Sequence, residues 1–77
     1  DYIARLFKQE TGHSLMGYVI LLRINHAKLL LTETEKSITD IALECGYTDF
    51  TYFSKQFKQL TGANPSKFRK ENKKIHN

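Results

Sequence analysis

The sequence contains one proline, four glycines and no alternating run rich in valine, isoleucine and threonine. Alternation of that kind is typical of a half-buried strand, whereas apolar residues at helical spacing are common along this chain. We therefore predict an all-α protein. A chain of 77 residues buries only about 60% of its unfolded surface, which leaves little interior for an enclosed active site.

Cysteine and long apolar runs are also scarce. Cys45 is the single cysteine, so it makes no internal disulfide and fits a reducing cytosol. The longest apolar stretch, Val19 to Leu22, is far shorter than the roughly 20 residues that a membrane helix needs. No signal-peptide pattern is present either. These features predict a cytoplasmic protein with no membrane partner.

No group of residues has the spacing of a catalytic or metal site. His13, His26 and His76 show no ligand spacing to one another or to Cys45, which is most simply a small buried residue. We therefore predict no metal, no cofactor and no enzyme activity.

Charge is divided unevenly along the chain. Residues 1–49 carry five Lys/Arg against seven Asp/Glu and residues 50–77 carry seven against one, giving balances of −2 and +6. A basic second half suits a polyanionic partner such as nucleic acid, although a solvated charged tail explains many such runs.

An internal repeat organises the sequence. At an offset of 50 residues, the segment from Tyr2 to Gly12 aligns with the segment from Tyr52 to Gly62, and six pairs are identical. Two amphipathic helices can resemble each other by chance, but the shared Phe-Lys-Gln-x-Thr-Gly run favours a true repeat. Each copy is predicted to be a helix ended by glycine and followed by a second helix, which carries Tyr18 or Phe68.

The residues before the second copy predict a helix, a short turn and another helix. Ser37 with Asp40 resembles a capping box, which is followed by one apolar stripe of Ile38, Ile41 and Ala42. Gly46 permits a left-handed turn residue, and Asp49 or Thr48 can cap the next helix. The second copy is therefore predicted to be a helix-turn-helix unit whose later helix enters the DNA major groove.

The rest of the chain is assigned around these two copies. Residues 1–13 have no such upstream partner, so we predict that the first unit is incomplete. Residues 14–33 are predicted to form the linker, in which Ser14 caps a helix from Leu15 to about Thr32 with inward positions that include Tyr18, Leu22, Ala27 and Leu30. Such a helix spans about 27 Å, enough to hold two reading helices roughly one duplex turn apart. Residues 36–72 are predicted to form the second unit and a final helix, which starts at Pro65 and is capped by Asn64. Residues 73–77 are predicted to form a frayed tail.

The helix after Asp49 carries the predicted base-reading surface. Thr51, Ser54, Lys55 and Lys58 share one face that lacks carboxylates, opposite an apolar set predicted to face the core: Phe50, Phe53, Phe57 and Leu60. The short hydroxyls of Thr51 and Ser54 permit close approach to base edges, and Lys55 can donate to guanine O6 and N7. Lys58 is predicted to reach a phosphate. For Phe50 a contact with a thymine methyl stays open beside the favoured core role.

The offset of 50 residues transfers this face to Asp1, Ala4, Arg5 and Lys8 in the first unit. Arg5 is the best base reader there, because a guanidinium can bind guanine bidentately, and Ala4 lies beside it. Lys8 corresponds to the phosphate contact Lys58. Three further phosphate contacts are predicted, one at the start of the Ser37 helix and two on the final helix, namely Thr39, Lys67 and Arg69. Arg23 is predicted to be a structural bridge instead.

At these residues the chain resembles the AraC/XylS family of bacterial transcription regulators. The resemblance covers nearly the whole chain and rests on Arg5-Leu6-Phe7-Lys8, Thr11-Gly12, Tyr18, Arg23-Ile24, Ala27, Ser37-Ile38, Ile41-Ala42, Gly46-Tyr47, Tyr52-Phe53-Ser54, Phe57-Lys58, Gly62, Pro65 and Phe68-Arg69. It implies two helix-turn-helix units joined by a long helix, with both reading helices in adjacent major-groove segments of promoter DNA. It further implies a sensor domain elsewhere in the full protein and two helices that precede residue 1.

The predicted function is sequence-specific binding of double-stranded DNA in transcription regulation, as an activator that also contacts RNA polymerase. The alternative is a helical protein-interaction module that docks on the transcription machinery through its basic face. The two differ in their dependence on salt, because binding to DNA weakens steeply as salt rises.

Overall fold

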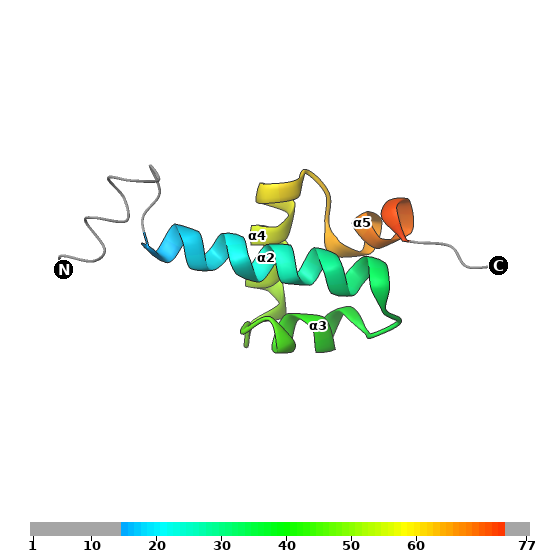
Figure 1. The fold of residues 1–77 in the computed structure, drawn as a ribbon, viewed down its shortest axis with the longest axis horizontal. Coiled ribbons are helices and arrows are strands. Elements are labelled where there is room, and N and C mark those ends of the chain that lie inside the picture. Colours follow the sequence, from blue (N-terminus) through cyan, green and yellow to red (C-terminus); the bar gives the residue numbers. More distant parts are fainter. Residues whose placement is uncertain (1–14, 74–77) are drawn as a thin grey trace.

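The computed structural model describes residues 15–73, and all regular structure in that range is helical. The helices are α2 (Leu15–Glu33), α3 (Ile38–Glu44), α4 (Phe50–Thr61) and α5 (Pro65–Asn72). Figure 1 shows α2 as the long central helix, with α4 crossing it near its middle, α3 along its C-terminal half and α5 near its C-terminal end. The all-helical prediction is confirmed, and α2 runs one residue beyond the end expected from the sequence.

Three short polar side chains fix where the later helices begin. The hydroxyl of Ser37 accepts the backbone N–H of Asp40 at 3.0 Å, as the capping box predicted. The Asp49 carboxylate accepts the N–H groups of Thr51 and Tyr52. The side chain of Asn64 accepts the N–H of Lys67 at 2.8 Å, directly before the proline that opens α5. These caps satisfy N–H groups that lack partners inside a helix, so they set each start locally.

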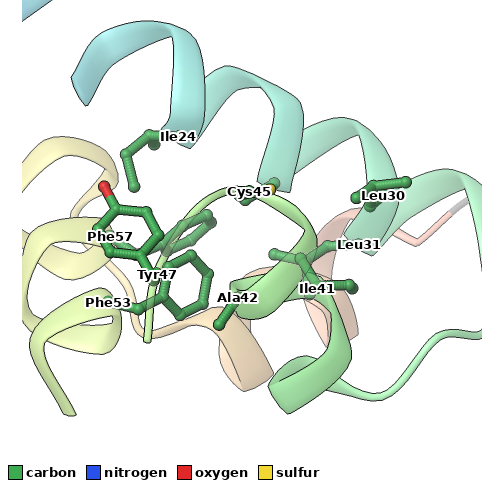
Figure 2. Close-up of a cluster of buried hydrophobic side chains, with 10 residues drawn as sticks. Ile24, Leu30, Leu31, Ile41, Ala42, Cys45, Tyr47, Phe53 and Phe57 are labelled. Atoms are coloured by element: carbon green, nitrogen blue, oxygen red, sulfur yellow. The ribbon is translucent and has the colours of Figure 1, made fainter. Parts of the chain in front are cut away.

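The core lies where α2, α3 and α4 meet, as Figure 2 shows. Its buried members come from all three helices and from the turn between α3 and α4: Ile24, Ala27, Leu30, Leu31, Ile41, Ala42, Cys45, Tyr47, Phe53 and Phe57. The Phe53 ring lies 5.1 Å from that of Tyr47 and 5.8 Å from that of Phe57, measured between centroids. Phe68 of α5 closes the cluster edge-on against Phe57 at 5.2 Å. The prediction that Cys45 is a small buried residue is confirmed, and burial raises the pKa of its thiol.

Four of the expected core positions are exposed instead. On α2 the buried face is centred on Ile24 and Ala27, and this leaves Tyr18 and Leu22 outside it. On α4 the fully buried residues are Phe53 and Phe57, while Phe50 and Leu60 are 46% and 51% exposed. Helical spacing defines a stripe but not its width, and the neighbouring helices cover only its central residues.

By length and composition alone, α2 could cross a membrane. Arg23 and Lys28 lie within it, however, and its buried face packs against α3, α4 and α5. These contacts make α2 the central helix of the bundle.

Gly46 and Gly62 provide a matched test of the turn between α3 and α4. Both have positive φ, 97° and 90°, but a Cβ on Gly46 would lie 3.1 Å from Arg23 Nε, while one on Gly62 would meet nothing. Backbone strain costs roughly 1–2 kcal/mol in such a conformation. Gly46→Ala is therefore expected to lower the free energy of unfolding by about 1 kcal/mol more than Gly62→Ala does. Urea denaturation measures both, and equal losses would show that Arg23 moves aside freely.

Candidate nucleic-acid interface

The turn between α3 and α4 is short and rigidly bonded. The N–H of Gly46 donates to Leu43 O at 3.1 Å, and the N–H of Tyr47 donates to Ala42 O at 2.9 Å. The guanidinium carbon of Arg23 lies 5.6 Å from the centroid of the Tyr47 ring, a cation–π contact that ties the turn to α2. The prediction that Arg23 is a structural bridge is confirmed. Together these contacts hold α3 and α4 as one helix-turn-helix unit.

The outer face of α4 carries the four residues predicted from its spacing, which we call the reading stripe: Thr51, Ser54, Lys55 and Lys58. Because Phe53 and Phe57 are fully buried, the opposite side of the helix faces outward. Thr51, Lys55 and Lys58 are exposed and Ser54 is half-buried. Lys55, Lys58 and Gln59 line a shallow hollow on the surface. The stripe therefore presents two hydroxyls near the helix start and two ammonium groups one turn further along.

Phe50 differs from the role that we favoured for it. Its ring lies 6.4 Å from that of Phe53, at the edge of the core rather than within it. It lines a groove with Ile38, Ser54 and Pro65 where the starts of α3, α4 and α5 converge. The core assignment was wrong, since nearly half of the Phe50 side chain is exposed. Contact with a thymine methyl stays a prediction, and the exposed ring is compatible with it.

The two cations predicted on α5 have different surroundings. Lys67 is exposed. Arg69 is half-buried; its Nε donates to Leu31 O at 3.0 Å and one Nη donates to Thr34 O at 3.2 Å. Leu31 lies in the last turn of α2 and Thr34 directly follows the helix, so Arg69 has a structural role at the C-terminal end of α2. Its contact with a phosphate stays a prediction that these hydrogen bonds do not favour.

Lys73, which we had placed in the frayed tail, shares this role. Its Nζ donates to Thr34 O at 2.7 Å and lies 2.6 Å from a carboxylate oxygen of Glu35. The hydrogen bond from Lys73 lowers the pKa of the Glu35 carboxyl. The sequence spacing could have indicated this role, because Lys73 follows Arg69 by four residues and shares a helix face with it if the final helix is extended.

The remaining predicted contacts are only partly described. Thr39 is exposed on the first turn of α3. Asp1, Ala4, Arg5 and Lys8 lie outside the described residues. Within residues 15–73, no cluster of three or more His, Cys, Asp or Glu side chains is arranged to hold a metal ion.

Sequence reasoning missed one polar network on the unit. The hydroxyls of Tyr47 and Tyr52 both bond to the side-chain amide of Gln56. Tyr47 belongs to the turn and Gln56 to α4, nine residues later. No helical spacing rule joins such a pair, so only the fold reveals it.

A rigid helix–turn–helix with a capped second helix and a cationic outer face defines a DNA-binding domain of the helix-turn-helix class. The helix-turn-helix domain family matches residues 1–71. The chain belongs to the AraC/XylS family of helix-turn-helix transcription regulators.

Individual relatives agree with this assignment. The transcriptional activator RhaR of Klebsiella pneumoniae is 42% identical over 67 residues, which cover 87% of this chain and 24% of RhaR. The C-terminal domain of AraT, a response regulator from Geobacillus stearothermophilus, superposes with a TM-score of 0.92 at 35% identity and covers 97% of this chain and 62% of that domain. The DNA-binding domain of AdpA, solved in complex with a target DNA, has a TM-score of 0.83 at 25% identity, covering 88% of this chain and 61% of that chain.

Arg69 and Lys67 allow structural and phosphate-binding roles to be separated on one helix. Arg69→Ala is expected to lower the free energy of unfolding by about 2 kcal/mol, because it removes hydrogen bonds from a cation to backbone carbonyls. Lys67→Ala is expected to change it by less than about 0.5 kcal/mol. Urea denaturation measures both. On duplex DNA, Lys67→Ala should lower the slope of log affinity against log salt by about 0.9, and Arg69→Ala should leave it unchanged. A reduced slope with normal stability in Arg69→Ala would assign that residue to a phosphate.

Proposed function

We propose that this chain binds promoter DNA sequence-specifically, with α4 as the recognition helix in the major groove. The observation that carries the proposal is the reading stripe, an exposed surface on the second helix of a helix-turn-helix unit. Its two ammonium groups attract a polyanion, while its hydroxyls are short enough for the backbone of α4 to approach the base edges. The DNA-binding domain of AdpA, which resembles this chain and was solved in complex with a target DNA, supports the binding of DNA.

Within this arrangement the residues of α4 divide into two roles. Thr51, Ser54 and Lys55 contact base edges, since they occupy the first turns of the helix. Lys58 lies one turn further along and binds a phosphate, which supplies affinity without sequence information. Lys67 and Thr39 are exposed on the flanking helices α5 and α3, where they reach the phosphates on either side of the groove.

The first unit reads a second segment of the same duplex. Arg5 and Ala4 contact its bases and Lys8 a phosphate, by transfer of the stripe across the internal repeat. The 19 residues of α2 span about 28 Å, which is comparable to the rise of one duplex turn, about 34 Å. The length of α2 therefore supports reading helices in adjacent major-groove segments.

The chain spans about a quarter of the length of the curated relatives it matches, such as RhaR at 24%. We accordingly infer that it is the DNA-binding part of a larger cytoplasmic regulator without enzyme activity. A sensor domain in the rest of that protein controls it, and contact with RNA polymerase makes it an activator. RhaR is itself a transcriptional activator, which supports the proposal that this protein activates transcription.

Lys55→Ala and Lys58→Ala test the division of roles on α4. Lys55→Ala is expected to relax preference at one base pair, worth about 1–3 kcal/mol of discrimination. Lys58→Ala is expected to weaken all sequences alike and to lower the salt slope by about 0.9. Titration of each variant with a duplex selected from a random pool, and with random duplex, at two salt concentrations measures both effects.

Two outcomes would contradict the proposal. Equal losses on selected and random duplex for both variants would remove the base-reading role of Lys55. Absence of salt-sensitive duplex binding by the wild-type chain would favour the alternative of a protein-interaction module.

A further inference from the structure

Three side chains form a continuous hydrogen-bonded chain from the buried turn to the surface of α4. The Tyr47 hydroxyl donates to Gln56 Oε1 at 2.5 Å, and Gln56 Nε2 donates to the Tyr52 hydroxyl oxygen at 2.8 Å. Tyr47 is buried, Gln56 is half-buried and Tyr52 is 52% exposed. The chain therefore begins in the core and ends at solvent.

The order of donors and acceptors along this chain follows from its buried end. The Tyr47 ring contacts both the guanidinium of Arg23 and the ring of Phe53, and these contacts restrict the position of its hydroxyl. Burial raises the pKa of the Tyr47 hydroxyl, which keeps its proton. It donates that proton to the carbonyl oxygen of Gln56, and this turns the amide NH₂ toward Tyr52. The Tyr52 oxygen thus accepts a hydrogen bond from within the protein.

A hydroxyl that accepts from one side still has its own proton to donate to the other. For Tyr52 that proton is directed away from Gln56, on a side chain of the first turn of α4 that neighbours Thr51 in sequence. Phosphate oxygens accept hydrogen bonds and donate none at neutral pH, so they match this donor. Tyrosine hydroxyls are among the groups that bind phosphates at protein–DNA interfaces.

We infer that Tyr52 donates a hydrogen bond to a DNA phosphate and that Gln56 and Tyr47 are positioning residues that hold its hydroxyl as a donor. The inference rests on the proposed function, since it requires α4 to lie on duplex DNA. It adds a neutral phosphate contact to the cationic ones already assigned. Such a contact fixes the register of α4 on the backbone and displaces no condensed counterion, because tyrosine carries no charge.

The neutral character of the contact gives it a distinctive signature. Tyr52→Phe is expected to reduce affinity about tenfold, the size of one hydrogen bond to a charged group, and to do so equally on selected and random duplex. The slope of log affinity against log salt should stay at its wild-type value. Lys58→Ala is the matched control on the same helix, because it should lower that slope by about 0.9. Fluorescence anisotropy of the full chain across a series of salt concentrations measures both quantities.

A double-mutant cycle tests the positioning role of Gln56. Gln56→Leu keeps a half-buried side chain of similar size but breaks both hydrogen bonds, and is expected to reduce affinity about threefold. In the Tyr52→Phe background the same change should have no effect, since no hydroxyl remains to be positioned. Circular dichroism melts of all three variants show whether each is folded at the temperature of the titration. If Gln56→Leu is unfolded there, Tyr47→Phe, which removes the hydrogen bond to Gln56, takes its place in the cycle.

The outcomes separate this inference from the function on which it rests. If the wild-type chain binds no duplex, the proposed function fails and this contact fails with it. If Lys58→Ala lowers the salt slope while Tyr52→Phe leaves affinity unchanged, the function stands and the phosphate contact is wrong. A loss confined to the selected duplex would make Tyr52 a base contact. Equal effects of Gln56→Leu with and without Tyr52→Phe would overturn the positioning role.

Discussion

The burial of one aromatic side chain, Phe53, determines how α4 is oriented. Its ring has no exposed surface and contacts the rings of Tyr47, Phe57 and Phe50. A phenylalanine buried in this way contributes about 1.5–3 kcal/mol relative to an exposed one, and aromatic pairs add to that. Since a helix is rigid about its own axis, the rotation that buries Phe53 also turns the reading stripe outward. The packing of the core and the exposure of the reading stripe are therefore two consequences of one constraint.

A second constraint divides the basic residues of the C-terminal half. Arg69 and Lys73 bind carbonyl oxygens at the end of α2, and through Thr34 O they join α5 to it. Lys55, Lys58 and Lys67 remain exposed. The positive charge of this half is thus divided between contacts within the fold and exposed side chains, and composition alone does not separate the two. Cations near the C-terminus of a helix are stabilised by its dipole, so the structural use of Arg69 and Lys73 follows from their place.

Local rules in the sequence predicted the features that depend on a few neighbouring residues. The caps at Ser37, Asp49 and Asn64 and the left-handed turn at Gly46 were correct, because each is decided within about four residues. The reading stripe was also correct as a surface, since helical spacing defines it. The core positions predicted for Phe50, Leu60, Tyr18 and Leu22 were wrong because their burial depends on which helices cover them, and spacing carries no information about that. The hydrogen bonds of Arg69 could not be predicted for the same reason, as its partners lie 35 and 38 residues away.

The cap of α4 limits how this helix can meet a phosphate. Helix N-termini bind anions through free backbone N–H groups, but here the Asp49 carboxylate already accepts two of them, from Thr51 and Tyr52. That carboxylate also adds a negative charge at the N-terminal end of α4. Anion binding by backbone N–H groups at this point is therefore weakened. In the proposed complex, Lys55 and Lys58 would supply charge further along the helix, while the Tyr52 hydroxyl would supply a donor in the first turn. The acidic cap that sets the start of α4 thus makes the proposed recognition depend on side chains rather than on the helix terminus.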